Sequence, residues 1–307
     1  MTTISVVIPV MNEVFNIQPI YQAVKEVIVR NNQQYEIIFV CDPSSDGTEI
    51  EIKKLTSLDS KVKGIFLADR AGQTESIRAG YEYSTGDAVI SMDADFQDPP
   101  ELIGEIINSW KSGALIVHTK RVDRTSDAFI YKTLTSIGYK FLSWITKGKI
   151  QNNVGDFRLI DKSILPLILK YKDPNPFWRG ITSLAGVKSA IVPYKRFLRR
   201  SGSTKYSLKI GSPTIALRGM ASFSSKPLEM VQIIGFFSII LCSILILVLV
   251  PLVFLAPGFP RGTPTIIVSL AILFSIQFAS TAVIATYLSV LIDQTRRRPN
   301  YLVLPNE

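Results

Sequence analysis

The chain contains 307 residues, of which 47% are hydrophobic, and it carries a formal net charge of +9 at pH 7. With a mean hydropathy of +0.25, this composition is apolar for a purely soluble protein. The positive charge is compatible with nucleic acid, an anionic membrane surface or phosphorylated substrates. Long apolar stretches near the C-terminus favour the last two, so we expect no nucleic-acid partner.

Short β-branched runs alternate with helix-like segments in the first third of the chain. This alternation is typical of an α/β fold, in which a parallel sheet is covered by helices on both faces. Turn residues separate the runs, and among them Asp46 is expected to cap a helix. Ligands of such sheets gather at the carboxyl ends of the strands. The predicted strands cover residues 4–10, 36–40, 62–68, 87–93 and 114–120.

Two aspartates, Asp93 and Asp95, stand at the end of the fourth predicted strand. Carboxylates two positions apart on an extended chain lie on the same side, and the small Ala94 leaves room for a hard cation and a diphosphate. Acidic residues at strand ends are also common as solvated or helix-capping groups, so the pair alone is weak support for a metal site. Other polar residues at strand ends are Asn12, Glu13 and Asp42.

The middle of the chain has a mixed pattern that becomes strongly basic. Residues 129–145 are amphipathic and are expected to form a helix packed on the sheet. The segment Lys195–Lys226 contains eight Lys or Arg residues and no acid. Within it, Ser212 and Pro213 open a pattern that predicts an amphipathic helix lying on an anionic membrane leaflet.

Two uncharged apolar stretches, 230–256 and 265–292, are each long enough to cross a bilayer, because about 20 helical residues span its hydrocarbon core. Arg261 is the one charged residue between them, whereas basic residues flank their outer ends. The positive-inside rule therefore predicts a multi-pass protein of the cell (inner) membrane, with both termini and the N-terminal domain in the cytoplasm. Core helices of a soluble protein are the alternative, which the length of the stretches disfavours.

Several segments, in their order along the chain, match a known pattern: SVVIPVMNE, EIIFVCDPSSDGT, RAGQTESIRAG, GDAVISMDADFQDPPELI, VGDFRLID, FWRG, SGSTKY, FSSKPL and RRRPNYLV. Together they resemble family 2 glycosyltransferases of the GT-A fold. Within that family they are similar to the polyprenyl-phosphate glycosyltransferases, such as dolichol-phosphate mannose synthase and the bactoprenol glucosyltransferases. The segments extend over nearly the whole chain, and their combined order is more specific than any one of them.

The resemblance implies a division of the chain into a Rossmann-like nucleotide-sugar domain and a membrane part. The expected limits are a GT-A domain at 1–207, a juxtamembrane amphipathic helix at 208–228, two transmembrane helices within 229–293 and a cytoplasmic tail at 294–307.

The resemblance also implies roles for individual residues. A divalent cation, Mg²⁺ or Mn²⁺, is expected on Asp93, Asp95 and Gln97, and Asp156 is expected to face the reacting centre as a catalytic residue together with Asp95. The residues implied to bind the nucleotide-sugar are Pro9, Val10, Asn12, Glu13, Asp42, Arg70, Gln73, Asp93, Ala94 and Asp95. Those implied to meet the acceptor phosphate are Arg121, Arg124, Arg158, Arg199, Arg200 and Lys205.

The chain departs from the family pattern at two places. Family members commonly carry two adjacent aspartates and a glycine after the second strand, where this chain has Cys41, Asp42 and Pro43. Gln73 stands where many members have lysine. These changes leave the nucleotide and the sugar open, but not the class of reaction.

Three further residues have a simpler, structural interpretation. Arg70 could serve only as a surface charge. Trp178 is more often a core residue than a platform for stacking a sugar. His118, the one histidine of the chain, ends an apolar strand and is expected to be structural rather than catalytic.

The function implied by the resemblance is inverting transfer of a hexose from a nucleoside-diphosphate sugar to a polyisoprenyl phosphate, for modification of a cell-envelope glycan. UDP, glucose and undecaprenyl phosphate are the first choices, with GDP, the lipid length and homo-oligomer formation left open. A processive polysaccharide synthase is one alternative, although its QxxRW signature is absent. A catalytically inert membrane scaffold for lipid-sugar transport is another, which the intact Asp93, Asp95 and Asp156 disfavour.

Overall fold

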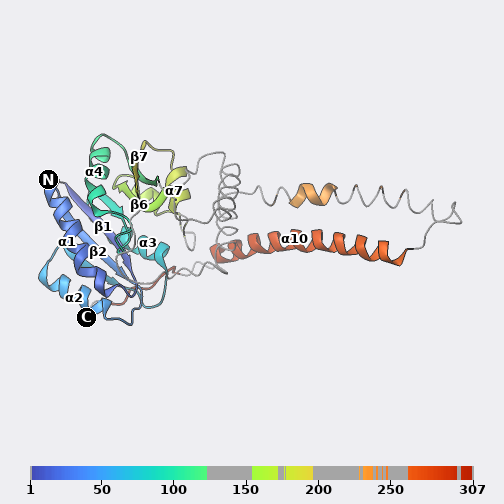
Figure 1. Cartoon of the computed structure of the whole chain (residues 1–307), viewed down its shortest axis with the longest axis horizontal. Helices are drawn as coiled ribbons and strands as arrows, with labels where there is room; N and C mark the ends of the chain where they lie inside the picture. The colour runs from blue at the N-terminus through green and yellow to red at the C-terminus, as the bar shows by residue number, and fades with distance from the viewer. Residues whose placement is uncertain are drawn as a thin grey trace. The chain divides into compact units, whose positions relative to one another are not determined.

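The computed structural model (Figure 1) divides into two units, one formed by Met1–Tyr206 with Arg297–Glu307 and the other by Ser207–Arg296. The residues that the structure describes are 2–122, 154–171, 176, 178–195, 228, 231–237, 240, 244, 247, 262–295 and 299–305.

A sheet forms the centre of the first unit, and within the described residues it has seven strands in the order β3-β2-β1-β4-β6-β5-β7. The five strands expected in the first part of the chain are all present, which confirms the alternating pattern. The strands are β1 (Thr3–Val10), β2 (Gln34–Cys41), β3 (Val62–Phe66), β4 (Ala88–Ser91), β5 (Ile116–Arg121), β6 (Val154–Asp161) and β7 (Ser189–Tyr194). The helices beside them are α1 (Val14–Arg30), α2 (Thr48–Leu58), α3 (Gln73–Tyr83), η1 (Pro100–Leu102), α4 (Ile103–Lys111), α6 (Leu165–Ile168) and α7 (Trp178–Leu184).

The expectation of a parallel sheet is right for the direction of β1 to β5, and β7 shares that direction, but β6 runs the opposite way. β6 lies between β4 and β5 and runs antiparallel to both, whereas β7 is parallel to β5. Phe157, Leu159 and Ile160 of β6 have no exposed surface, so this strand needs neighbours on both sides and both faces. The sheet is therefore mixed, and β6 places the segment around Asp156 next to the end of β4.

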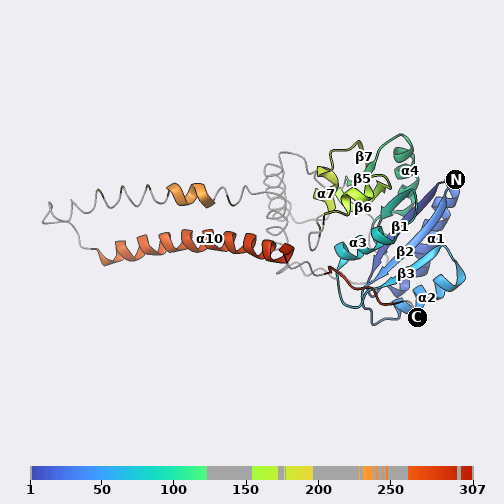
Figure 2. The same ribbon diagram turned by 180° about the vertical axis from the view of Figure 1, so that it is seen from behind.

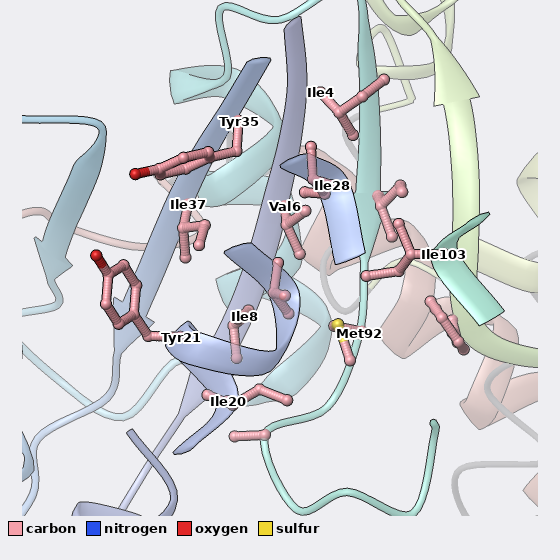
Figure 3. Packing of buried hydrophobic residues seen from close by; sticks show 14 of the residues in the cluster. Ile4, Val6, Ile8, Ile20, Tyr21, Ile28, Tyr35, Ile37, Met92 and Ile103 are labelled. Carbon is pink, nitrogen blue, oxygen red and sulfur yellow. The ribbon is translucent and has the colours of Figure 1, made fainter. Parts of the chain in front are cut away.

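The helices α1, α2 and α4 cover one face of the sheet. Side chains of a strand alternate between the two faces, so Ile4, Val6 and Ile8 of β1 all point to this side. Figure 3 shows them packed against α1, where Ile20 and Ile28 line the inner face of the helix. All five side chains are fully buried, which makes this layer the main core of the unit.

The helix α3 covers the opposite face, and it approaches β1 closely at Gly80. A Cβ atom added at Gly80 would lie 2.1 Å from Cγ1 and 2.8 Å from Cγ2 of Val7. Glycine is therefore required there by the space between helix and strand. The close contact between Gly80 and Val7 also fixes the position of the first turn of α3 relative to the carboxyl ends of the strands.

We expect Gly80→Ala to destabilise the fold by about 2 kcal/mol, because overpacking outweighs the helix propensity that alanine adds. Gly104→Ala in α4 is the matched control, since the nearest atom to its added Cβ is the side-chain Nδ2 of Asn31 at 3.1 Å. Chemical unfolding of both variants measures the difference. The double variant with Val7→Ala should recover part of the loss; equal stability of the two glycine variants would contradict the close approach.

The second unit contains α10 (Thr263–Thr295), a helix of 33 residues. This helix covers the second predicted span. Among the described residues, it is the one helix that is long and apolar enough to cross a membrane, and its qualifying window is Ile272–Ser289. None of that window is buried inside the chain. Of the first predicted span, residues 231–237 are helical, and most of the remainder lies outside the described residues. The predicted helices at 129–145 and 208–228 also lie outside them, apart from Leu228.

Candidate active site

The loops that follow β1 and β2 are joined by hydrogen bonds. The side-chain oxygen of Asn12 accepts a bond from the backbone N–H of Ser45 at 2.8 Å. Asp46 accepts bonds from the N–H groups of Val14 at 3.0 Å and Thr48 at 3.0 Å, the first residues of α1 and α2. Its predicted capping role is therefore confirmed, and it serves two helices at once.

Of the residues predicted to bind the nucleotide-sugar, two lie at the end of β1. Pro9 and Val10 are the last residues of β1 and pair with Val40 and Cys41 of β2. Val10 is buried in the core, as is Ala94. The first strand thus ends at Val10, as the hydrophobic pattern predicted, and the loop begins after it. Glu13 is nearly buried, and its carboxylate accepts a bond from Asn16.

Asp42 holds the loop of residues 67–72, which leaves the end of β3 and leads into α3. Its carboxylate accepts hydrogen bonds from the backbone N–H of Ala71 at 3.2 Å and of Gly72 at 3.0 Å. The side chain of Arg70 is exposed on this loop. Asp42 therefore shapes the loop from within, and its contact with a nucleobase or ribose stays a prediction.

Asp93 and Asp95 follow β4, and each is fixed by a neighbour. The side-chain amide of Gln73 donates to Asp93 at 2.6 Å, and the backbone N–H of Gln97 donates to Asp95 at 3.0 Å. Phe96, between them and Asp98, has a φ of 60°, a left-handed conformation that is costly for a bulky residue. Strain of this kind persists only where the surrounding structure enforces it, and such residues are common at functional sites.

The acidic side chains at this end of the sheet repel one another. Burial raises the pKa of Asp93, and the nearby carboxylates of Asp98, Asp95 and Asp156 raise it further, to about 7. Four carboxylates thus gather at the carboxyl end of β4, and their repulsion is felt at Asp93. A cation bound there would relieve the repulsion.

Asp98 was not among the predicted site residues, but it is almost completely buried and belongs to the site. It accepts a hydrogen bond from the hydroxyl of Tyr194 and lies 3.7 Å from Nη2 of Arg121. The Nε of Arg121 donates to Tyr194 at 3.0 Å. These contacts hold Arg121, a predicted acceptor-phosphate residue, beside the acidic cluster. The run of acids after β4 was the available signal for Asp98.

Asp156 is brought to the cluster by the antiparallel pairing of β6 with β4. The hydroxyl of Ser91 at the end of β4 donates to the backbone oxygen of Asp156 at 2.6 Å. Its two carboxylate oxygens are bound by different arginines, Oδ1 by Arg158 and Oδ2 by Arg179 at 3.1 Å. Burial alone would raise the pKa of Asp156, but Arg179 and Arg158 outweigh burial and lower it to about 2. The carboxylate is therefore ionised throughout the physiological range.

The prediction that Arg158 meets the acceptor phosphate is corrected by its burial. Its side chain has no exposed surface, and its guanidinium also donates to the backbone oxygen of Gly155 at 3.1 Å and to Thr182 at 3.3 Å. A group enclosed in this way positions Asp156 and cannot reach a phosphate. Arg179 was not predicted, although it stands in the quoted FWRG segment; its side chain is 31% exposed.

Trp178 and His118 are core residues, as expected. Trp178 is 1% exposed, and its indole N–H donates to the backbone oxygen of Thr74 at 2.9 Å. His118 is 2% exposed, and its Nδ1 has no hydrogen-bond partner within the part of the chain that the structure describes. Burial first, and the charge of Arg158 second, lower the pKa of His118 to about 4. The imidazole is therefore neutral in the folded protein.

The single histidine should make the fold sensitive to mild acid. The unfolded chain gains a proton at His118 near pH 6.5 whereas the folded chain gains it only near pH 4, so stability falls as the pH drops between these values. We expect a loss of about 2.5 kcal/mol from this group between pH 7.5 and 4.5. Denaturant unfolding of wild type and His118→Leu at both pH values isolates it; parallel pH dependence of the two proteins would refute the assignment.

The donor set after β4 suits a cation that is shared with a substrate. Among the described residues, no three His, Cys, Asp or Glu side chains converge to hold a metal by themselves. Mg²⁺ in nucleotide sites is usually bound by one or two carboxylates, and substrate phosphates and water supply the other ligands. Asp93 and Asp95 match that pattern. The remaining predicted site residues, Arg124, Arg199, Arg200 and Lys205, lie outside the described residues.

Comparison with known proteins gives consistent matches. The chain is 35% identical over 303 residues to the bactoprenol glucosyl transferase of Shigella phage SfX, which covers 98% of each chain. It is 33% identical over 299 residues to the uncharacterized glycosyltransferase YkcC of Bacillus subtilis (strain 168), covering 97% of this chain and 92% of that protein.

A solved structure has the same fold. The glucosyl-3-phosphoglycerate synthase of Mycobacterium tuberculosis, crystallised with Mn²⁺, UDP and phosphoglyceric acid, superposes with a TM-score of 0.52 at 17% identity. The match covers 72% of this chain and 76% of that one, and it shows a GT-A-like α/β fold. Residues 5–168 match Glycosyl transferase family 2. The chain therefore belongs to glycosyl transferase family 2.

Proposed function

We propose that this glycosyltransferase moves a hexose from a nucleoside-diphosphate sugar to a polyisoprenyl phosphate. The observation that carries the proposal is the cluster of Asp93, Asp95, Asp98 and Asp156 at the carboxyl end of β4, with Arg121 and Arg179 beside it. The carboxylates suit a divalent cation, and the guanidinium groups suit the two anionic substrates, the nucleoside-diphosphate sugar and the lipid phosphate. The bactoprenol glucosyl transferase that matches along the whole chain supports a lipid acceptor.

On the donor side, Asp93, Asp95 and Gln97 would hold a divalent cation together with the diphosphate. The cation would offset the negative charge that builds on the leaving nucleoside diphosphate. Gln73 already fixes the carboxylate of Asp93, and the Asp95 loop is fixed through the N–H of Gln97. The protein thus supplies two carboxylates in fixed positions. The side-chain amide of Gln73 carries no charge, so it leaves the negative charge of Asp93 available to the cation.

On the acceptor side, an oxygen of the lipid phosphate attacks the anomeric carbon of the sugar. The bond from that carbon to the diphosphate oxygen breaks, and the nucleoside diphosphate leaves with the electron pair, so the configuration inverts. A phosphate monoester has a second pKa of about 6 and is largely ionised at neutral pH. It needs no strong base, which agrees with Asp156, whose pKa of about 2 makes it a weak one.

Asp156 would then act by position and charge. Its ionised carboxylate holds Arg179 at 3.1 Å, and this partly exposed guanidinium is able to exchange that contact for an incoming phosphate. Arg121 lies in the same cluster and is proposed, with Arg124, Arg199, Arg200 and Lys205, to hold the acceptor phosphate. Asp156 would thus set the charge and orientation at which these arginines meet the two substrates.

We further propose UDP-glucose as donor, undecaprenyl phosphate as acceptor, and a place in the cell membrane with the catalytic unit in the cytoplasm. The names of the matched relatives and the apolar helix α10 support these choices. A membrane location predicts that carbonate washing leaves the chain in the membrane fraction.

The test is transfer by the purified protein in detergent, with a panel of radiolabelled UDP- and GDP-sugars. Each donor is offered polyprenyl phosphate, polyprenyl alcohol or a free sugar, with Mn²⁺, Mg²⁺ or excess chelator. We expect a labelled lipid only with the phosphate acceptor and a divalent cation. Equal use of the alcohol would refute the acceptor, a polymeric product would indicate a processive synthase, and a lack of transfer from every donor would support an inert scaffold.

A further inference from the structure

The C-terminal segment of residues 299–305, here called the tail, lies along the free edge of the sheet (Figure 2). The backbone N–H of Leu304 donates to Phe66 at 2.8 Å, and the N–H of Ala68 donates to Leu302 at 2.9 Å. Leu67 and Val303 form an antiparallel bridge. The tail therefore extends the sheet beyond β3 for a few residues, although it follows α10 in the sequence.

The tail contacts the beginning of the loop of residues 67–72. Ala68, which donates to the tail, is three residues before Ala71, which donates to Asp42. On the inner side, the N–H of Leu67 donates to the backbone oxygen of Cys41 at 3.0 Å. The loop is thus held between the end of β2 on one side and the tail on the other.

A second contact reaches α3. The hydroxyl of Tyr301 donates to the carboxylate of Glu82, near the end of this helix. The first residue of α3 is Gln73, which donates to Asp93. The tail therefore contacts the loop that carries Arg70 and the helix that carries Gln73. Both residues are proposed to bind the nucleotide-sugar donor.

We propose that the tail positions the donor-binding loop and that Tyr301 is a positioning residue for nucleotide binding. The inference rests on the proposed donor site. Among the described residues, the backbone pairing of the loop with a neighbouring strand or with the tail is limited to Leu67 and Ala68. Its conformation therefore depends on two anchors, Asp42 on the inner side and the tail on the outer side. Loss of the tail anchor lets the loop and the first turn of α3 sample other conformations, and nucleotide binding must then restore the order.

A purely protective tail is the competing possibility, since a covered edge strand resists pairing with other chains. The protective and the positioning roles predict different effects of a single substitution in the tail. Loss of the Tyr301 hydroxyl leaves the backbone pairing to β3 and the covered edge intact. Only a positioning role predicts a change in nucleotide affinity from that loss.

The variants are Tyr301→Phe, Glu82→Ala, Glu82→Gln and a chain that ends at Arg298. Leu302→Ala is the matched control, because its side chain is 62% exposed and its bond to Ala68 uses only the backbone. All are full-length membrane proteins in one detergent, except the shortened chain. The measurements are binding of UDP and of GDP with Mn²⁺ by calorimetry, KM for donor and for polyprenyl phosphate, and the melting temperature.

We expect Tyr301→Phe and Glu82→Ala each to weaken nucleotide binding and raise donor KM about threefold to tenfold, the effect of one hydrogen bond. The double variant should be no worse than either single one. Glu82→Gln, which still accepts a bond, should behave like wild type, and acceptor KM should not change. The shortened chain should lose more than tenfold in nucleotide affinity, while Leu302→Ala stays normal.

Variants that lower the melting temperature but bind nucleotide and use donor like wild type would overturn the inference and leave the proposed function in place. A wild-type protein that binds neither nucleotide and transfers no sugar would overturn both.

Discussion

Asp95→Asn is expected to abolish nearly all sugar transfer. Asparagine can still accept the hydrogen bond from the N–H of Gln97, so the loop after β4 should keep its form while one negative charge is lost. Without that charge the proposed cation would be held poorly, and the leaving diphosphate would carry its charge uncompensated. We expect kcat/KM to fall about 10³-fold or more, equal to about 4 kcal/mol of transition-state stabilisation.

The measurement is transfer with and without Mn²⁺ or Mg²⁺, for wild type, Asp95→Asn and Asp95→Ala. Glu105→Ala in α4 is the matched control, because it removes an exposed acid of the same unit. Excess chelator should reduce wild type to the level of the Asp95 variants, and added cation should restore wild type alone. Full turnover in chelator, or an Asp95→Ala enzyme of near-normal rate, would exclude the metal assignment.

Asp156→Asn is expected to reduce both activity and stability. It leaves the guanidinium of Arg158 without a counter-charge in a place with no exposed surface. Removal of one partner from a buried ion pair costs about 3 kcal/mol of folding free energy or more. Transfer should fall by at least about 100-fold, since Arg158 and Arg179 lose the carboxylate that orients them.

Unfolding and transfer measurements on Asp156→Asn, Arg158→Met and Arg179→Ala separate the two contributions. Arg158→Met should resemble Asp156→Asn in stability, whereas Arg179→Ala should mainly affect transfer, because that side chain is partly exposed. Glu51→Gln is the control for an exposed pair with Lys54 and should change stability by less than about 0.5 kcal/mol. Unchanged stability in Asp156→Asn would contradict the buried pair.

The sign of the pH dependence follows from the lowered pKa of Asp156. The folded carboxylate titrates near pH 2 and the unfolded one near pH 3.9, so its contribution to stability is complete above about pH 4 and disappears as the pH falls toward 2. His118 acts at higher pH, between about 6.5 and 4, which separates the two groups in one acid titration.

Local patterns in the sequence predicted much of the fold. Hydrophobic alternation and turn chemistry act over a few residues. They account for strands β1 to β5, the capping role of Asp46 and the core positions of Trp178 and His118. Asp93 and Asp95 were found in the same way, because they directly follow an apolar strand. α10 follows from the length of an uncharged stretch.

Contacts between distant residues could not be predicted in this way. The sequence by itself determined the α/β class, the acidic pair after β4 and an apolar helix near the C-terminus, since each is encoded within one segment. Only the tertiary structure decided that β6 inserts antiparallel beside β4, which brings Asp156 to the acidic pair. There Asp156 contacts two arginines, the fully buried Arg158 and the partly exposed Arg179. Likewise, only the fold placed the tail on β3 and Tyr301 on Glu82, 219 residues apart in the chain. The physical reason is that strand order and ion pairing depend on burial and charge summed over the whole unit, which no local pattern records.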